Sequence, residues 1–447
     1  MEPNVRETLA KRTLAHSTAD RTEVLISYEN AALTRFAHEN VHQNVASEDA
    51  VISVRAIVGG RTGVAQTNRT GDDAIRDVVE RAIEMAKLAP VDPAQPDLPA
   101  GAPTTTPPGA YVDATAAADA QTRAQMCGEF FRVAERDGLW SAGYASTAAR
   151  GYTVANSNGA LASFDGTTAG VDVKMSAADS TGFAESASTD IRLVDAAAVA
   201  ETAARKARET KAPKSVEPGA WTVILEAPAF AELLAFLGSH FSAQSYDEGS
   251  SFASGALGTT MLGENVTLRD DYAHPLALDA PFDFEGAPTQ RLSLVENGIV
   301  RSVVTDSYWA HKLDMDNTGH ALPAPNAYGP QPRNLVMMPG TRTTEELIAS
   351  TKRGILVSRL WYVRTVDQLQ AIVTGMTRDG TYLIEDGRIT RPARDVRFTD
   401  SVLRILEATE ALSATPRLVS EAEHYGRRFA YGTVCPALRA SGFRVTG

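Results

Sequence analysis

Residues 221–241 read WTVILEAPAFAELLAFLGSHF, and this stretch opens the second half of the chain. Its first part, Trp221 to Leu225, is apolar and contains β-branched residues, which is typical of a buried strand. Its second part, Ala227 to Phe241, carries large apolar side chains at helical spacing, which predicts a helix with one buried face. The side chains on that face are Phe230, Leu233, Leu234, Leu237 and Phe241. A helix that leaves the end of a strand is a good place for a functional site.

The chain beyond this helix contains short runs that are typical of strands. These runs are Thr267–Leu268, Arg291–Glu296, Ile299–Thr305, Gly354–Trp361, Gln370–Met376 and Thr381–Ile384. We therefore predict a C-terminal domain, residues 219–447, that is mostly antiparallel sheet with a leading helix. Pro213 and Pro218 follow a predicted helix and mark the boundary in front of this domain.

The first half of the chain mixes helices and strands without a regular βαβ alternation. Helices are predicted over Val5–His16, Gly71–Ala89, Ala116–Arg136 and Ala196–Lys211. Strands are predicted over Thr22–Tyr28, Val51–Val58 and Gly63–Thr67, followed by a meander of short strands up to Asp190. Prolines crowd residues 90–110, which predicts an extended excursion over the surface. We therefore predict an α+β fold with an N-terminal α/β layer and strand meander over residues 1–215.

Length and charge limit the classes of function. A chain of 447 residues suggests two domains of about 150–250 residues each. The formal net charge of -12 would repel a phosphate backbone, so we expect no nucleic acid partner. No apolar run approaches the roughly 20 residues of a membrane span, and Met1 to Arg12 lacks the apolar core of a secretory signal. We expect a cytoplasmic protein with no membrane partner, in which Cys127 and Cys435 are reduced thiols.

The segment His38-Glu39-Asn40-Val41-His42 matches the HExxH pattern of zinc peptidases. That pattern works when both imidazoles lie one turn apart on a buried helix, with the glutamate as base and a third ligand elsewhere. The surrounding residues, Ala31 to Val45, can be drawn as a helix with one apolar side, but the flanking segments are strand-like. Val45 also replaces the glycine of the longer metzincin pattern. We therefore interpret the string as a coincidental match.

Other signatures of catalysis are missing from the sequence. It contains no Gly-x-x-x-x-Gly-Lys-Ser/Thr loop for nucleotides and no Gly-x-Ser-x-Gly elbow for a serine hydrolase. Two acidic stretches, Asp270-Asp271 and Asp283 to Gly286, could ligate a hard cation. Capping of turns between strands is the simpler role for both stretches.

Several short blocks follow one another along both halves of the chain. In the first half they are Leu33–Ala37 with His42–Asn44, Val54–Gly63 and Ala155–Gly159. In the second half they are Gly249–Phe252, Asp283–Arg291, Glu296–Gly298, Asn317–Gly319 and Tyr382–Pro392. In their order and spacing these blocks resemble the TldD/TldE family, which is also known as PmbA and was once labelled a modulator of DNA gyrase. The resemblance spans nearly the whole chain.

The resemblance implies a zinc site that this chain has lost. A TldD-type subunit resembles a zinc peptidase with a His-Glu-x-x-x-His string on the first helix of the second half. Aligned on Leu233-Leu234, this chain has Ala235 for the first histidine and Phe236 for the glutamate, so that only His240 remains. One imidazole cannot hold Zn²⁺, and no carboxylate beside it could activate a water molecule. The family's cysteine ligand also has no clear counterpart, because Cys435 lies in a predicted closing strand.

TldE-type subunits resemble this chain in lacking the zinc ligands, and they pair with a TldD-type subunit around a chamber for unfolded or small peptides. The resemblance implies a non-catalytic subunit of a heterodimeric metallopeptidase, with no cofactor in this chain and zinc in the partner. Two alternatives stay open: a homodimeric hydrolase that uses other residues or the His38 string, and a regulator of a DNA enzyme. The matching segments indicate His240, Tyr246, Asp247 and His320 as candidate peptide contacts near the shared cavity.

Overall fold

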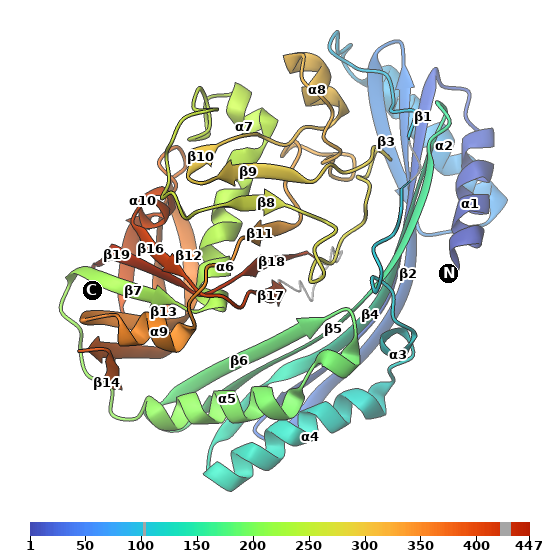
Figure 1. Ribbon diagram of the computed structural model, residues 1–447. Coiled ribbons are helices and arrows are strands. Elements are labelled where there is room, and N and C mark those ends of the chain that lie inside the picture. Colours follow the sequence, from blue (N-terminus) through green and yellow to red (C-terminus); the bar gives the residue numbers. More distant parts are fainter. Residues whose placement is uncertain (102–103, 421–430) are drawn as a thin grey trace.

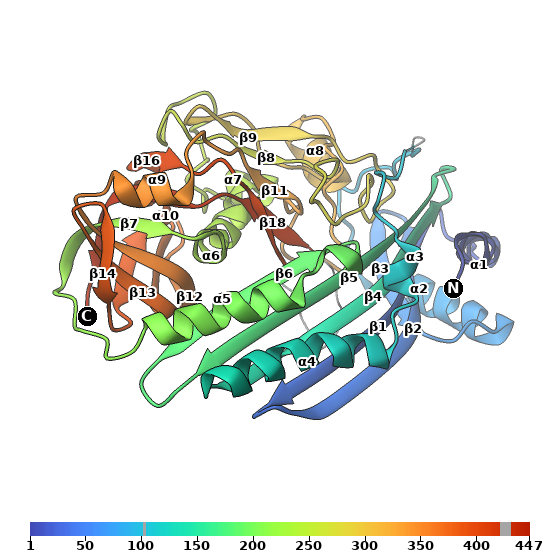
Figure 2. The ribbon, with the colours of Figure 1, turned by 60° about the horizontal axis from the view of Figure 1, so that its bottom comes forward.

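The computed structural model describes residues 1–101, 104–420 and 431–447. Figure 1 shows a long curved sheet with helices on its outer side, and a second part of the chain that lies against the inner side of the curve. The chain begins at the outer helices and ends in the second part, so the two termini lie on opposite sides of the molecule (Figures 1 and 2). The mixture of helices and largely antiparallel sheets confirms the predicted α+β class.

The curved N-terminal sheet has the strand order β3-β2-β1-β4-β5-β6, and all neighbouring strands are antiparallel. Its strands are β1 (Arg21–Ala37), β2 (Asn40–Val58), β3 (Arg61–Thr67), β4 (Trp140–Asn156), β5 (Leu161–Ser176) and β6 (Thr181–Ser188). The sequence predicted only Thr22–Tyr28 of β1 and Val51–Val58 of β2. The rest of β2 was missed because its first half is exposed and polar, so that it lacks the alternation of a half-buried strand. The rest of β1 was missed because its buried apolar residues also fit one side of a helix.

Helices cover the outer face of this sheet. They are α1 (Pro3–Ala15), α2 (Asp72–Leu88), α4 (Ala120–Asp137) and α5 (Ala196–Glu209), with the short α3 (Asp113–Ala116) and a 3-10 turn (Ile191–Leu193) between them. Figure 2 shows α4 and α5 lying along the sheet. Val24 and Ile26 pack with α1 and α2, whereas Leu25 faces the second part of the chain, because successive side chains of a strand point to opposite faces. Phe36 continues the outer row and stacks on Phe130 of α4, with 5.4 Å between ring centroids.

Among its described residues, the second part of the chain contains one six-stranded sheet and one seven-stranded sheet. One sheet, in the order β10-β9-β8-β11-β18-β17, contains β8 (Leu268–Asp270), β9 (Leu292–Glu296), β10 (Ile299–Val300), β11 (Leu335–Met337), β17 (Arg417–Ser420) and β18 (Gly432–Cys435). The other contains β7 (Gly219–Leu225), β12 (Arg353–Asp367), β13 (Ile372–Glu385), β14 (Arg388–Pro392), β15 (Arg397–Ser401), β16 (Thr409–Leu412) and β19 (Leu438–Val445). Most pairs are antiparallel, as predicted, but β7 with β12 and β11 with β18 are parallel. Long connections between these strands make the parallel pairings possible.

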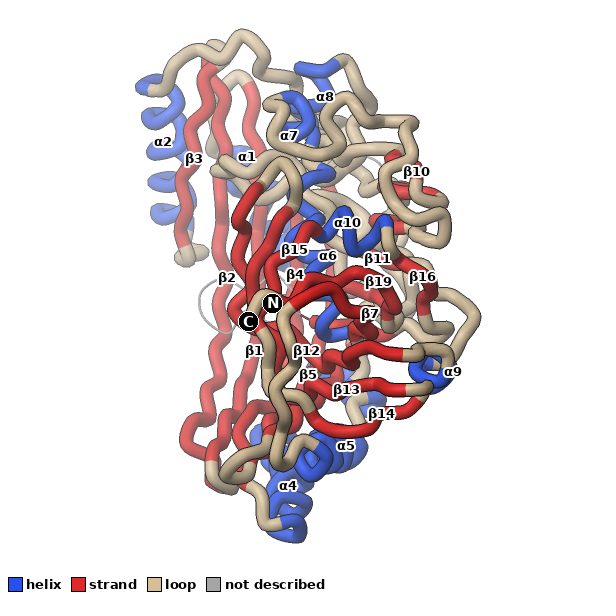
Figure 3. Tube along the Cα trace, turned by 90° about the vertical axis from the view of Figure 1, so that its left-hand side faces the viewer, coloured by secondary structure: helices blue, strands red, loops and turns tan. Residues whose placement is uncertain are grey.

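Helix α6 (Ala227–Gly238) lies inside this second part and packs against strands of both sheets. Phe230, Leu233, Leu234 and Leu237 are fully buried, as the predicted apolar face requires. The other helices are α7 (Ala243–Asp247), α8 (Ser307–Leu313), α9 (Thr344–Ala349) and α10 (Val402–Glu407), and a 3-10 turn (Ser239–Phe241) follows α6. Figure 3 shows α6 among the strands of the second part of the chain.

The inner face of the curved sheet makes part of the contact between the two parts of the molecule. Leu25 and Phe164 of the sheet pack with Phe282 and Phe284 of the second part. Arg150 of β4 also donates a hydrogen bond from Nη2 to the carbonyl oxygen of Leu278. These contacts fix where α6 lies relative to the inner face of the sheet.

Two sequence predictions concern the chain as a whole. The domain limits at residues 215 and 219 stay predictions. The proline-rich segment, apart from residues 102–103, contains turns and irregular backbone, and its role as a surface excursion stays a prediction. In the part of the chain that the structure describes, none of the helices combines the length and the apolar character that crossing a membrane requires.

Candidate functional site

Helix α6 is positioned by the strand that precedes it and by the residues that pack around it. Strand β7 ends at Leu225, and Glu226 is the N-cap of the helix, with Pro228 in its first turn. Proline is favoured there because its missing N–H group would have no partner inside the helix. Glu226 also forms an ion pair with Lys206 of α5, with 2.5 Å between Oε2 and Nζ. The start of α6 is therefore tied to the N-terminal part of the chain.

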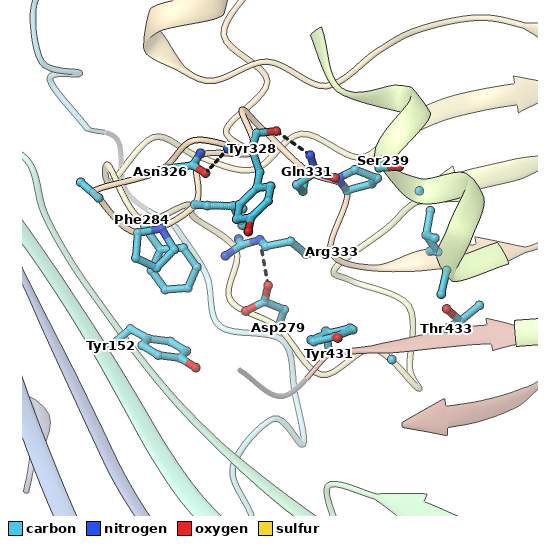
Figure 4. A pocket seen from close by; sticks show the side chains of 18 of the residues that line it. Tyr152, Ser239, Asp279, Phe284, Asn326, Tyr328, Gln331, Arg333, Tyr431 and Thr433 are labelled. Carbon is cyan, nitrogen blue, oxygen red and sulfur yellow. Dashed lines mark hydrogen bonds and ion pairs between the residues drawn. The ribbon is translucent and has the colours of Figure 1, made fainter. Parts of the chain in front are cut away.

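The end of α6 forms one wall of a cavity of about 590 Å³ (Figure 4). Small residues of the helix end, Ala235, Gly238 and Ser239, contribute to this wall. The remaining lining residues are Gln66, Tyr152, Asp279, Phe284, Leu322, Pro323, Ala324, Pro325, Asn326, Tyr328, Gln331, Pro332, Arg333, Leu335, Tyr431, Gly432 and Thr433. The volume lies in the range of roughly 300–1,000 Å³ that is typical of ligand pockets. The cavity draws on both parts of the molecule, so it depends on how they pack together.

The charged groups of the cavity lining form a pair. Asp279 Oδ2 lies 3.0 Å from Nε of Arg333, and both side chains are buried. Arg333 also donates from Nη2 to the carbonyl oxygen of Phe282 at 3.1 Å, and its guanidinium carbon lies 4.8 Å from the centroid of the Phe284 ring. Figure 4 shows the pair at the centre of the cavity lining. The two charges compensate each other, so the lining offers no uncompensated charge to a ligand.

Aromatic rings form much of the opposite wall. Tyr152 of β4 meets Phe284 edge to face, with 5.3 Å between ring centroids. Burial raises the pKa of the Tyr152 hydroxyl to about 12, so it carries its proton at neutral pH. Tyr328 is exposed at the rim, where its backbone N–H donates to Oδ1 of Asn326 at 2.9 Å. Such rings offer large apolar contact areas with few internal rotations.

The positions expected for zinc ligands do not fit a metal. Ala235 lines the cavity and has no donor atom, and Phe236 packs against the apolar core. His240 follows α6 in the 3-10 turn and is 2 % exposed, and burial lowers its pKa to about 4, so the ring is neutral near pH 7. Its Nδ1 has no hydrogen-bond partner among the described residues.

The other described side chains that could ligate a metal do not form a metal site either. Within residues 1–101, 104–420 and 431–447, no three histidine, cysteine, aspartate or glutamate side chains come together as a metal site requires. Cys435 is fully buried at the end of β18, and its Sγ donates to the carbonyl oxygen of Ala227 at 3.4 Å. Burial raises the pKa of this thiol, which disfavours the thiolate that a metal needs.

Family models match both halves of the chain. Residues 218–447 match the C-terminal domain of the PmbA/TldA metallopeptidases, and residues 22–86 match domain 1 of the same metallopeptidases. The first match alone covers more than half of the chain. The chain belongs to the PmbA/TldD family.

Individual relatives agree with this membership. The structure of TldE from Thermococcus kodakarensis superposes with a TM-score of 0.87 over 99% of this chain and 100% of that chain, at 20% identity, which shows a shared fold. A metalloprotease of Methanothermobacter thermautotrophicus is 29% identical over 180 residues, which are 38% of this chain and 37% of the relative. A metalloprotease PmbA homolog of Haemophilus influenzae is 30% identical over 178 residues, which are 38% of this chain and 36% of the relative. The aligned parts therefore span little more than a third of these curated relatives.

The candidate peptide contacts of this PmbA/TldD-family chain do not line the cavity among its described residues. His320 is fully buried, with its Nδ1 2.9 Å from Oγ1 of Thr318 and its Nε2 3.4 Å from Oδ1 of Asp270. Tyr246 and Asp247 lie on α7, where Asp247 pairs with Lys312 of α8 at 2.9 Å. His240 lies next to the cavity wall in sequence, but its ring packs beside Phe252. Their role in peptide binding stays a prediction.

The His38 string lies on a β-hairpin. His38 and Glu39 form the turn between β1 and β2 with φ angles of 49° and 55°, and His42 lies on β2. Residues 31–45 therefore do not form the helix that their apolar spacing allowed, because the segment pairs as two antiparallel strands. Glu39 Oε1 accepts hydrogen bonds from the backbone N–H of Ser141 at 2.6 Å and from its hydroxyl at 3.0 Å. The glutamate secures the hairpin to β4.

The acidic stretches act within the protein as turn caps and strand contacts. Oδ2 of Asp270 accepts from the backbone N–H groups of Arg333 at 2.6 Å and Asn334 at 3.0 Å. Oδ1 of Asp283 accepts from the N–H groups of Glu285 and Ala287 at 3.0 and 2.9 Å. These bonds fit the capping role that the sequence favoured over a cation site.

A second group of charged residues was not found from the sequence. Arg55 of β2 forms ion pairs with Glu23 of β1 at 2.6 Å and with Glu285 of the second part at 2.9 Å. The charges of Glu285 and Arg55 also shift the pKa of Asp306. We call these four residues the Arg55 cluster. Burial raises the pKa of Glu23 to about 7, although Arg55 lowers it, and burial followed by Glu285 raises the pKa of Asp306 to about 6. The only signal in the sequence was that Arg55 and Glu285 lie within family blocks.

Proposed function

We propose that this chain is a non-catalytic, TldE-type subunit of a heterodimeric metallopeptidase that cleaves unfolded, small or modified peptides. The observation that carries the proposal is the end of α6. Ala235 and Phe236 stand where the resemblance requires an imidazole and a carboxylate, and His240 is buried and neutral. In this proposal zinc and its activated water belong to a TldD-type partner, which supplies the three or four ligands that zinc needs.

The role of this chain is then to bind and orient the peptide. The cavity beside α6 includes Leu335 at the start of β11, and Gly432 and Thr433 of β18. An extended peptide that runs along strands gains main-chain hydrogen bonds, while pockets beside the strand select its side chains. Strands β11 and β18 lie inside their sheet, so the cavity beside them supports the side-chain pocket of this mode of binding and not the added strand.

We place the complex in the cytoplasm without nucleic acid or membrane partners. The net charge of -12 supports the first exclusion, because an acidic surface repels phosphate groups. A regulator of a DNA enzyme would show affinity for DNA that falls steeply with salt, which a titration at two salt concentrations would detect.

The test is zinc counting combined with a peptide cleavage assay. We expect the purified chain to carry no stoichiometric zinc and to leave unfolded peptides intact. Mixing it with a TldD-type subunit from the same genome should give cleavage and one zinc per heterodimer, while the partner alone serves as the control. One equivalent of zinc and peptide cleavage in the isolated chain would overturn the proposal in favour of a homodimeric hydrolase.

A further inference from the structure

We propose that the cavity at the end of α6 is a side-chain pocket that binds an uncharged aromatic or large aliphatic residue of a peptide. The choice of a peptide as ligand rests on the proposed function. The preference for an uncharged apolar residue rests on the cavity itself. Ala235 stands where the resemblance expects an imidazole, and it borders the space that we assign to the bound side chain.

The first argument is the size of the residues on the helix wall. Ala235, Gly238 and Ser239 are small, and Ala235 is only partly buried because it borders the open space. A Cβ added to Gly238 would already lie 3.4 Å from Cδ1 of Leu335. A larger side chain at Ala235 would project into the cavity, and a larger side chain at Gly238 would press against Leu335. The helix end is therefore shaped to leave the volume of about 590 Å³ open.

The second argument is the charge of the lining. Asp279 and Arg333 are the charged residues among the described lining residues, and they pair with each other at 3.0 Å. The other oxygen of Asp279 accepts from the backbone N–H of Ala280 at 2.7 Å, and Arg333 donates to the carbonyl of Phe282. A charged side chain that entered the cavity would lose its hydration without gaining an uncompensated partner, which is costly. An uncharged side chain meets no such penalty.

The third argument is the chemistry of the walls. Tyr152 and Phe284 present ring surfaces on one side, Leu322 and Leu335 present aliphatic surfaces, and Tyr328 stands at the rim with 77% of its surface exposed. Figure 4 shows Tyr152, Phe284 and Tyr328 around the paired Asp279 and Arg333. Aromatic walls bind other rings and aliphatic groups by apolar burial and edge-to-face contact.

Binding of blocked five-residue peptides to the full-length chain tests this pocket. The dye-labelled peptides differ only in their central residue, which is phenylalanine, leucine, lysine or glutamate, and binding is followed by fluorescence anisotropy. We expect the phenylalanine and leucine peptides to bind at least about tenfold more tightly than the two charged peptides. Equal affinity for all four peptides, or no binding of any, would overturn the proposal.

Two variants locate the binding in this cavity. Ala235→Phe fills the space and should weaken binding of the phenylalanine peptide at least about tenfold, whereas Ala124→Phe, the same change at an exposed position of α4, should leave it unchanged. Tyr328→Ala removes a ring from an exposed loop, which does not threaten the fold, and should weaken binding severalfold. Unchanged affinity in both Ala235→Phe and Tyr328→Ala would place the binding elsewhere and overturn the proposal.

The outcome is separable from that of the proposed function. If the isolated chain shows the apolar preference but never restores cleavage with a TldD-type partner, the pocket stands and the subunit role fails. If mixing restores cleavage but Ala235→Phe changes neither peptide affinity nor the preference among the four peptides, the pocket fails and the subunit role stands.

Discussion

The end of α6 and the Arg55 cluster use ionisable residues in opposite ways. At α6, the positions expected to hold zinc carry Ala235 and Phe236, and the adjoining cavity contains a compensated ion pair. At the Arg55 cluster, buried carboxylates from both parts of the molecule gather around one guanidinium. Perturbed pKa values often mark catalytic groups, but ion-pair networks that hold a structure together perturb them as well. In this chain the concentrated buried charge joins the two parts of the molecule, and the expected metal position is uncharged.

We expect the largest change in the free energy of unfolding when Arg55 is replaced. Arg55→Met leaves Glu23 and Glu285 buried without their cation, and breaking a buried pair from one side costs about 3–5 kcal/mol. Urea unfolding of the two proteins measures the difference. Arg301→Met removes an exposed arginine that pairs with Glu296 and should leave stability nearly unchanged. A loss below about 1 kcal/mol for Arg55→Met would mean that the cluster does not hold the two parts together.

A smaller effect is expected from pH. Burial raises the folded-state pKa of Glu23 to about 7, above the value of an unfolded glutamate, so the folded protein keeps a proton that the unfolded chain releases. This contribution to stability is fully present below about pH 4.5 and is lost as pH rises through about 7.

The matched variant for this pH effect is Glu23→Gln, which keeps the shape of the side chain and cannot titrate. Between pH 5 and 8 we expect the wild type to lose about 1–3 kcal/mol of unfolding free energy relative to the variant. Parallel pH profiles of the two proteins would show that Glu23 does not titrate in this range.

The remaining histidine after α6 should have a still smaller effect. His240 is buried and neutral, and its Nδ1 has no described partner, so His240→Leu removes an unsatisfied polar atom. Stability should stay the same or rise by up to about 1 kcal/mol, with no change in zinc content. Thermal unfolding and metal analysis check both points, with Leu234→Ala in the core of α6 as a destabilising control. Loss of bound zinc in His240→Leu would assign the residue a metal role.

The smallest effect is expected at the His38 string. His42 is an exposed residue of β2, so His42→Ala should change stability by no more than about 0.5 kcal/mol and should leave the zinc content as it was. Equilibrium dialysis with zinc is the measurement. A zinc equivalent that disappears in His42→Ala would restore the string as a metal site and reverse the comparison with α6.

Much of the local structure could be predicted from the sequence. The strand before α6 and the apolar face of α6 follow from residues whose spacing matches a strand and a helix, and the structure buries Phe230, Leu233 and Leu237 as expected. The long strands β1 and β2 were predicted only in part. The first half of β2 is polar and exposed, and the second half of β1 has apolar residues that also fit one side of a helix. The HExxH letters were a poor guide, since the pairing of β1 with β2 places them at a hairpin.

The sequence by itself determined the family resemblance, the strand that leads into α6, and the missing zinc donors at positions 235 and 236, because side-chain chemistry and apolar spacing are local properties. Only the tertiary structure decided that Ala235 faces a cavity bordered by Tyr152 and Arg333, that His320 is buried, and that Arg55 meets Glu285. These contacts join residues up to 230 positions apart. They depend on how the curved sheet closes over the second part of the chain, and the pattern of neighbouring residues carries no direct record of that packing.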